Sequence, residues 1–253
     1  SDNFYPETNA PASRGFEHCK VWVKNGHKVS VLTSFPNFPA GKIFLGYKNK
    51  LRQIDNIDGI SVHRVWTYMS PNTGIWRRIL DQISFMFSSF INGLFLKNVD
   101  IIIGTTPHIF TPISAVLLSK VKKTVFVLEL RDLWPDSMLA VGINNKNLLF
   151  KSAKFIERKL YLSADKIIPV TNSFKKYLMN CGVSSKKIKV IMNGVDTNIF
   201  NFKNSNYVKR SSKTFIISYI GTIGMAHSII TLIEAAKILS KKHKDLTIQF
   251  QII

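Results

Sequence analysis

Short apolar runs alternate with longer segments of helical periodicity along most of this chain. The short runs are rich in Ile, Val and Phe and predict buried strands, whereas apolar residues three or four positions apart predict amphipathic helices. Strands are predicted at residues 29–33, 60–66, 99–104, 124–130, 166–170, 188–191, 214–220 and 246–253. Helices are predicted at residues 16–24, 75–96, 110–119, 148–164, 174–180 and 229–241. This alternation indicates an α/β fold with parallel sheets covered by helices.

A polar stretch divides this pattern into two parts. Residues 201–213 are dominated by Lys, Asn and Ser, and we interpret them as an interdomain linker. The first domain then comprises residues 1–200, and residues 214–253 begin a second βαβ unit. The chain opens on a loop-like stretch and stops inside a predicted strand. We therefore expect the first strand of the first domain to be missing and the second domain to be truncated.

The most informative segment is VFVLELRDLWPDS, residues 125–137. Its apolar beginning predicts a buried parallel strand, which leads directly into Arg131, Asp132 and Trp134. Ligands of open α/β sheets bind at the carboxyl ends of the strands, so these side chains suit a polar, charged substrate. An Arg–Asp pair that only caps the loop would leave the same pattern. Glu129 lies within the predicted strand, and we interpret it as a buried, paired carboxylate.

The chain is strongly basic, and its charge limits the partners that suit it. Its 253 residues include 35 Lys and Arg against 15 Asp and Glu, a net charge of +20. Nucleic acid, an anionic membrane surface and phosphorylated substrates all match such a charge. The sequence has neither zinc-finger spacing nor an aromatic-rich RNA-binding signature, which argues against nucleic acid. Two cysteines without metal-ligand spacing, and no visible signal peptide, favour a reducing cytoplasm.

The helix predicted at residues 75–96 is unusually apolar, and three interpretations of it remain open. It is a helix packed inside the α/β domain, an interfacial helix whose Arg77 and Arg78 meet anionic headgroups, or a membrane span. In the interfacial case, the side chains expected to enter the lipid are Phe85, Phe87 and Phe90. A span is disfavoured because the helix lies between two predicted strands of one sheet.

Four motifs occur in order over nearly the whole chain. They are FYPETNAPASR followed by GHKVSVLT, then DIIIGTTPHIF, ELRDLWPDS, and VIMNGVDTNIF followed by a glycine turn and EAAKIL. With these motifs the chain resembles the GT-B glycosyltransferases of the retaining family 4, of the bacterial capsule, O-antigen and colanic-acid type. The resemblance implies two Rossmann-like domains with parallel sheets and a cleft between them. It also implies a nucleotide-sugar donor, and neither a metal nor another cofactor.

The resemblance further implies roles for residues of the first domain. Asp132 is expected near the reacting centre, where it orients the acceptor hydroxyl or accepts its proton. Arg131 is expected to bind a phosphate of the donor or the acceptor, because its planar guanidinium matches such oxyanions. Trp134 is expected either to stack on a sugar or to pack under its loop. His108 is an acceptor-side candidate, with a loop histidine bonded to the backbone as the alternative.

Two segments are expected to contact the donor diphosphate. The first is the loop before the first helix, with Asn9, Ala10 and Arg14. The second is a glycine turn between a strand and a helix, whose backbone N–H groups would face phosphate. Its expected contact residues are Gly221, Thr222, Gly224 and His227. His227 stands in a segment where many relatives have Arg or Lys.

The resemblance implies a saccharide on polyprenyl diphosphate as the acceptor. The enzyme would then work from the cytoplasm on the anionic inner face of the plasma membrane. Without the rest of the donor domain, we expect these 253 residues to be inactive by themselves. Two alternatives remain open: a nucleotide-sugar epimerase of the same fold, using carboxylates such as Glu129, Asp132 and Asp136, and a basic α/β protein that binds nucleic acid with a steep salt dependence.

Overall fold

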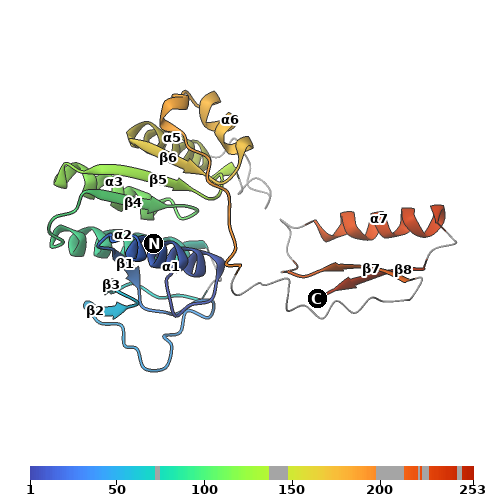
Figure 1. Ribbon diagram of the computed structural model, residues 1–253, viewed down its shortest axis with the longest axis horizontal. Helices are drawn as coiled ribbons and strands as arrows, with labels where there is room; N and C mark the ends of the chain where they lie inside the picture. The colour runs from blue at the N-terminus through green and yellow to red at the C-terminus, as the bar shows by residue number, and fades with distance from the viewer. Residues whose placement is uncertain (72–74, 137–147, 198–213, 222, 224–227, 244–246) are drawn as a thin grey trace. The chain divides into compact units, whose positions relative to one another are not determined.

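The computed structural model describes residues 1–71, 75–136, 148–197, 214–221, 223, 228–243 and 247–253 (Figure 1). The chain forms two compact units. The first comprises Ser1–Pro135 and Leu148–Met192, and the second comprises Asp136–Asn147 and Asn193–Ile253. The predicted linker at residues 201–213 lies outside the described residues. The predicted boundaries of the two domains therefore stay predictions.

One sheet of the first unit has three strands in the order β1-β3-β2. Its strands and the preceding helix are α1 (Ala10–Lys24), β1 (Ser30–Ser34), β2 (Arg52–Ile57) and β3 (Ile60–Val65). β1 and β3 are parallel, whereas β2 runs antiparallel to β3 after a tight turn at Asp58 and Gly59, which both have positive φ. The sequence pattern does not predict β2, because most of its side chains are polar and alternate residues are exposed.

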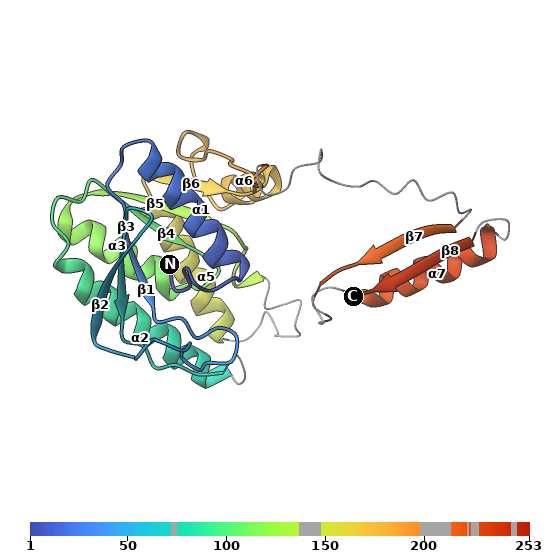
Figure 2. The ribbon, with the colours of Figure 1, turned by 60° about the horizontal axis from the view of Figure 1, so that its bottom comes forward.

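A second sheet of the same unit is fully parallel, in the order β4-β5-β6. Its strands are β4 (Ile101–Thr105), β5 (Val125–Leu130) and β6 (Lys166–Pro169). The helices of this part are α2 (Ile75–Leu94), α3 (Phe110–Lys122), α5 (Leu148–Ser163), α6 (Asn172–Asn180) and the short 3-10 helix η1 (Ser185–Lys187). Figures 1 and 2 show these strands surrounded by helices. The predicted α/β class with parallel sheets is confirmed.

The prediction of a strand at residues 188–191 is wrong, because the structure has only an isolated bridge to β6 there. Two backbone hydrogen bonds tie the segment to β6: the N–H of Lys189 donates to Ile167 at 3.0 Å, and that of Ile191 donates to Pro169 at 3.1 Å. The apolar pattern therefore marks a segment that lies along the sheet without completing a ladder.

Apolar residues of β5 and α3 form the centre of the main core. Phe126 and Leu128 in β5 are 1% and 0% exposed and share one face of the strand, whereas Val125 on the other face is 45% exposed. Gly104 in β4 lets α3 approach closely. A Cβ at this position would lie 2.8 Å from Cβ of Ala115 and 3.0 Å from Cα of Pro112.

The long helix α2 packs against α3 and β1 with one face. Phe85 is buried, Ser89 Oγ lies 2.8 Å from Ser114 Oγ, and a Cβ at Gly93 would lie 2.5 Å from Cδ2 of Leu118. Phe85 therefore belongs to the protein interior, which corrects the expectation that it enters lipid in the interfacial arrangement. None of the helices in the described residues is long and apolar enough to cross a membrane.

The second unit contains one βαβ arrangement. Its elements are β7 (Thr214–Tyr219), α7 (Ile229–Lys242) and β8 (Thr247–Ile252). β7 and β8 pair in parallel over their full length. None of the described residues in these three elements is buried, and Phe215 and Ile230 are 66% and 69% exposed.

Candidate functional site

The loops that follow β4 and β5 are joined through the side chain of Thr106. Its Oγ1 accepts hydrogen bonds from the backbone N–H of Arg131 at 2.9 Å and of Asp132 at 3.3 Å. The N–H of Thr106 donates to the carbonyl of Glu129 at 3.1 Å. These bonds hold Arg131 and Asp132 at the carboxyl ends of two parallel strands, where α/β sheets bind ligands.

Glu129 lies near the end of β5 and pairs with Arg14 of α1. Arg14 Nη2 is 2.7 Å from Oε1 of Glu129, and the two side chains are 11% and 15% exposed. This agrees with the interpretation of Glu129 as a paired carboxylate. Nδ1 of His18, one helical turn after Arg14, lies 3.9 Å from the same oxygen. Burial lowers the pKa of His18, Glu129 opposes this shift, and Arg14 and Arg131 lower the pKa further, so the neutral imidazole is favoured.

Arg14 reaches Glu129 from within α1, which begins earlier than the hydrophobic pattern predicts. Asn9 caps the helix, since its Oδ1 accepts a hydrogen bond from the N–H of Ala12 at 2.9 Å, and a proline occupies the first turn. Ala10 and Arg14 are therefore helical, which corrects their expected place in the loop before the helix. Asn9 does lie at the end of that loop.

Arg131 is half-buried beside the Arg14–Glu129 pair. Burial lowers the pKa of Arg131, and Arg14 lowers it further while Glu129 raises it. Within the part of the chain that the structure describes, its guanidinium has no hydrogen-bond or ion-pair partner. Arg14 pairs with Glu129 whereas Arg131 does not, so the positive charge of Arg131 suits an anionic ligand.

Asp132 is exposed and does not pair with Arg131. Its Oδ1 accepts a hydrogen bond from the N–H of Leu133 at 3.0 Å. One carboxylate oxygen therefore caps its own loop, but without the Arg–Asp pair of the loop-capping interpretation. Among the described residues, Oδ2 has no partner, so it can accept a hydrogen bond from a ligand.

His108 lies in the same loop as Thr106, between β4 and α3, but its side chain contacts α2. Its Nδ1 is 2.8 Å from Nε2 of Gln82, so it contacts a side chain of α2. Burial lowers the pKa of His108, Asp2 raises it, and Arg78 lowers it further. The structure therefore does not bring His108 into hydrogen-bond contact with Arg131 or Asp132.

A group of carboxylates that sequence reasoning misses lies near His108. Burial, together with the nearby Asp2 and Glu7, raises the pKa of Asp81 to about 7, although a backbone hydrogen bond from Ser70 opposes the shift. One oxygen of Glu7 accepts hydrogen bonds from the N–H groups of Asn37 and Phe38, both at 2.8 Å. Asp81 lies far along the chain from Asp2 and Glu7, so no motif could have revealed the group.

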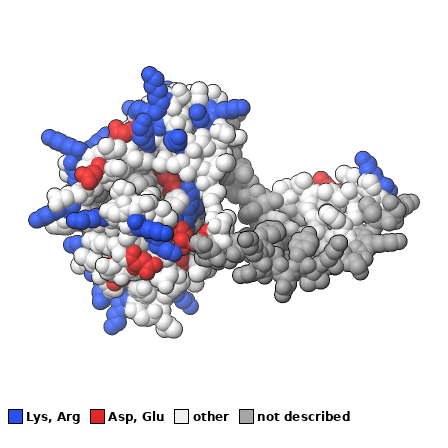
Figure 3. Space-filling view, viewed as in Figure 1, with Lys and Arg blue, Asp and Glu red and all other residues white. Residues whose placement is uncertain are grey.

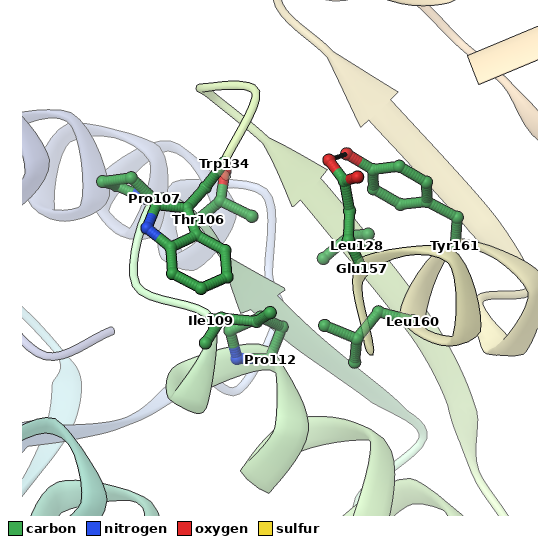
Figure 4. Close-up of a pocket in the computed structure, with 9 residues that line it drawn as sticks. All are labelled: Thr106, Pro107, Ile109, Pro112, Leu128, Trp134, Glu157, Leu160 and Tyr161. Carbon is green, nitrogen blue, oxygen red and sulfur yellow. Dashed lines mark hydrogen bonds between the residues drawn. The ribbon is translucent and has the colours of Figure 1, made fainter. Parts of the chain in front are cut away.

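Trp134 packs under its loop and contacts the main core. Figure 4 shows its ring beside a small pocket that is also lined by Thr106, Leu128 and Glu157. Across the pocket, Glu157 Oε1 accepts a hydrogen bond from the hydroxyl of Tyr161 at 2.7 Å. The sequence carries a signal for this second feature, since Glu157 is the one acid in an otherwise basic helix.

Of the four residues expected in the glycine turn, only Gly221 is described. Its N–H donates to the carbonyl of Ile253 at 3.2 Å, so this donor already has a backbone partner. Thr222, Gly224 and His227 lie outside the described residues. The expected phosphate contacts of this turn therefore stay predictions.

No group of three or more His, Cys, Asp and Glu side chains within the described ranges has the arrangement of a metal site. The group at the ends of β4 and β5 instead combines one uncompensated cation with an exposed carboxylate. Such a combination can bind an oxyanion and a hydroxyl side by side.

The fold is similar to two solved structures of HepE from Anabaena, one in complex with UDP and glucose and the other with UDP-glucose. The identities are 14% and 13%, and the TM-scores are 0.45 and 0.43. Each similarity covers 78% of this chain, but only 57% and 56% of the two HepE chains, so this chain spans little more than half of their length. A search of curated proteins found no match.

The sequence model of Glycosyltransferase Family 4 matches residues 16–199. The match covers well over half of the chain and includes α2, β5 and both loops joined by Thr106. The chain therefore belongs to Glycosyltransferase Family 4, as its motifs predict.

Proposed function

We propose that this chain belongs to an enzyme that transfers a sugar from a nucleotide-sugar donor to a saccharide acceptor, with retention at the anomeric carbon. The observation that carries the proposal is the group formed by Arg14, Glu129, Arg131 and Asp132 at the carboxyl ends of the parallel strands. Membership of Glycosyltransferase Family 4 supports the reaction class.

The departing nucleoside diphosphate needs stabilisation as its negative charge develops. In the proposal Arg131 supplies the positive charge that stabilises the diphosphate. Its guanidinium is half-buried and has no ion-pair partner in the described part of the chain. The Arg14–Glu129 pair beside it holds the local geometry, since both of its side chains are mostly buried. Asn9 and Ala10, at the N-terminus of α1, offer further donors for phosphate.

Asp132 acts on the acceptor in this proposal. Its exposed carboxylate keeps one oxygen for the acceptor hydroxyl, which it orients or deprotonates as the new glycosidic bond forms. His108 is proposed to contact the acceptor further from the reacting carbon, and Trp134 serves as packing for the Asp132 loop. The turn with Gly221, Thr222, Gly224 and His227 is proposed to contact the donor diphosphate, and no metal is needed.

The acceptor is proposed to be a saccharide on polyprenyl diphosphate, used for capsule or O-antigen type polysaccharide at the inner face of the plasma membrane. The net charge of +20 supports this, because an anionic leaflet attracts a basic protein. Figure 3 shows Lys and Arg over much of the visible face of the first unit, with acidic residues more sparsely placed.

Labelling of lipids tests this function. The complete protein is incubated with membranes of its own host and with radiolabelled UDP-sugars or GDP-sugars, and the label in the lipid extract is counted. We expect label from one donor, and its loss in Asp132→Asn but not in Asp100→Asn. Asp100 is an exposed aspartate that precedes β4, at the opposite end of the sheet.

Other results would contradict the proposal. Conversion of the donor into a different free nucleotide-sugar, without labelled lipid, would indicate an epimerase. Tight DNA binding with a steep salt dependence, and no affinity for any nucleotide-sugar, would indicate a nucleic-acid-binding protein.

A further inference from the structure

Helix α2 carries exposed apolar residues on the side turned away from its packed face. These residues, which we call the outer stripe, are Trp76, Leu80, Phe87, Ile91 and Leu94, and they are 73%, 53%, 57%, 52% and 40% exposed. They are three, four or seven positions apart, so they line one side of the helix. Phe85, Ser89 and Gly93 lie on the opposite side and pack against the unit.

The outer stripe is an unusual surface for a protein in water. A helix that is apolar on both sides is normally covered on both sides. Folded monomers rarely expose a long apolar patch, and such patches commonly mark a binding surface. Over about 27 Å of helix, at ~1.5 Å per residue, the stripe is long enough to contact a lipid surface along its length.

Positive charge lies at both ends of the outer stripe. Arg77 and Arg78 are exposed in the first turn of α2, and Lys97 is exposed just after its end. Lys122 Nζ donates to the carbonyl of Leu94 at 3.0 Å, which adds a cation at the end of the helix. The only acid of α2 is Asp81, whose pKa burial raises to about 7, so its negative charge is reduced near neutral pH.

This charge distribution argues against a second copy of the chain as the partner. Two copies packed stripe to stripe would bring cationic ends together in either direction, because both ends are positive. An anionic bilayer instead offers phosphates to the cations and an acyl region to the apolar side chains.

We propose that the outer stripe docks α2 in the plane of an anionic bilayer surface, with Phe87 and Ile91 at the headgroup–acyl boundary and Arg77 on lipid phosphates. Trp76 lies at the level of the headgroups, where an indole has apolar and polar neighbours. This inference rests on the membrane location included in the proposed function and gives it a defined surface. Of the three phenylalanines expected to enter lipid, the outer stripe keeps Phe87, whereas Phe85 faces the interior and Phe90 is half-buried.

Sedimentation with vesicles tests the docking surface without any substrate. The complete protein is mixed with vesicles of phosphatidylcholine alone or of phosphatidylcholine with phosphatidylglycerol. We expect the wild type to bind the anionic vesicles. The partition coefficient of Phe87→Glu/Ile91→Glu should be lower by about tenfold or more, because two carboxylates replace the apolar side chains that enter the lipid. The matched control is Val21→Glu/Leu45→Glu, which changes two exposed apolar residues outside α2 and leaves binding unchanged.

The electrostatic contribution is tested with single cations. Arg77→Gln is expected to weaken binding to anionic vesicles by about fivefold. Lys186→Gln, in η1, is the control and is expected to have a much smaller effect. Thermal melting verifies that each variant folds, and the milder Leu80→Gln replaces the double variant if that one does not.

Three results would overturn the docking surface. They are equal binding to both kinds of vesicle, equal binding by the stripe and control variants, and a wild-type dimer in solution that Phe87→Glu/Ile91→Glu converts to monomer. Failure of the proposed function looks different. If Asp132→Asn binds vesicles like the wild type while no donor labels any lipid, the docking surface stands and the transfer reaction does not.

Discussion

Arg131 and Asp132 are adjacent in the chain, yet their side chains have opposite surroundings. Arg131 is half-buried beside Arg14 and Glu129, and burial lowers its pKa. Asp132 is exposed and bonded to its own loop through Leu133. The attraction between a cation and an anion is stronger where water is partly excluded. A phosphate should therefore bind Arg131 more tightly than it binds an exposed arginine.

Replacing Arg131 tests whether this residue binds phosphate. We expect Arg131→Ala to weaken the binding of UDP or GDP by about tenfold or more, because it removes a charge-assisted contact. Arg131→Lys should recover only part of the affinity, since an ammonium lacks the planar fork. Titration calorimetry on the complete protein measures both. Arg158→Ala, at an exposed position of α5, is the control, and an Arg131→Ala variant with wild-type affinity would exclude this role.

Replacing Asp132 by Asn tests its role in the reaction. The turnover number is expected to fall by roughly 10²–10⁴-fold, the range associated with loss of a general base. The melting temperature should change little, because the side chain is exposed and an amide oxygen can still cap the loop. Steady-state kinetics with the donor identified by lipid labelling gives the answer. Turnover within about tenfold of wild type would mean that Asp132 is not the key residue.

Asp81 makes stability depend on pH in a defined direction. Its pKa in the folded chain is raised to about 7 by burial and by Asp2 and Glu7, whereas an unfolded aspartate has a pKa of about 3.9. The folded chain therefore holds the proton more tightly, and the stability that this group contributes is present below the unfolded pKa and lost as pH rises through about 7. Asp81→Asn mimics the protonated form at every pH.

We therefore expect Asp81→Asn to melt higher than the wild type at pH 8, with a smaller difference at pH 5. Melting curves of both proteins at the two pH values measure this. The control is Asp100→Asn, at an exposed position, whose melting temperature should differ from the wild type equally at both pH values. Asp58 is avoided because its positive φ favours Asn over Asp. A difference in melting temperature that does not grow between pH 5 and pH 8 would contradict the raised pKa.

At the scale of elements, the site depends on how closely α3 lies on the parallel sheet. The loop from β4 to α3 carries Thr106, which holds the backbone of Arg131 and Asp132. Gly104 permits this approach, because a side chain there would meet Ala115 and the backbone of Pro112. The position of the loop with Arg131 and Asp132 therefore depends on a glycine outside that loop.

Adding one methyl group at Gly104 should destabilise the fold. In Gly104→Ala the new Cβ would lie 2.8 Å from Ala115 Cβ and 3.0 Å from Pro112 Cα, so α3 must move. Overpacking of this kind costs about 1–3 kcal/mol. Urea unfolding measures the loss of free energy of unfolding. Gly194→Ala is the matched control, since a Cβ there meets nothing within 4 Å, and equal effects of the two changes would contradict the packing argument.

At the scale of the whole molecule, the buried core is distributed very unevenly. Both hydrophobic core clusters lie in the first unit, on residues before Met192. The second unit has no buried residue in the described parts of β7, α7 and β8. Stability measured on the chain should therefore report mainly on the first unit.

Removal of residues 193–253 tests this distribution. We expect the remaining chain to unfold in one cooperative transition, with a melting temperature within about 5 °C of the whole chain, because little core is lost. Residues 193–253 alone should show no cooperative transition, since two strands and one helix bury too little apolar surface. Calorimetry on chains 1–253, 1–192 and 193–253 measures these transitions. Loss of cooperativity in the 1–192 chain would show that the second unit contributes to its stability.

The sequence by itself determined most of the secondary structure, the α/β class and the family. These follow from local periodicity and from motifs, which do not depend on what the chain packs against. The same reasoning placed Arg131 and Asp132 at the carboxyl end of a strand, because a run of apolar residues ends directly before them. It missed β2, whose polar side chains have the alternation of an exposed strand but not the composition of a buried one.

Only the tertiary structure decided which side chains meet. The pairing of Arg14 with Glu129, the raised pKa of Asp81 and the outward direction of Phe87 on a helix that buries Phe85 all depend on segments far apart in the chain. Burial and ion pairing arise in the folded structure. The sequence predicts them only where the residues that contact each other are close in the chain. That is why the sequence placed Arg131 and Asp132 at the end of a strand, while the fold determined which side chains lie beside them and which face of α2 is exposed.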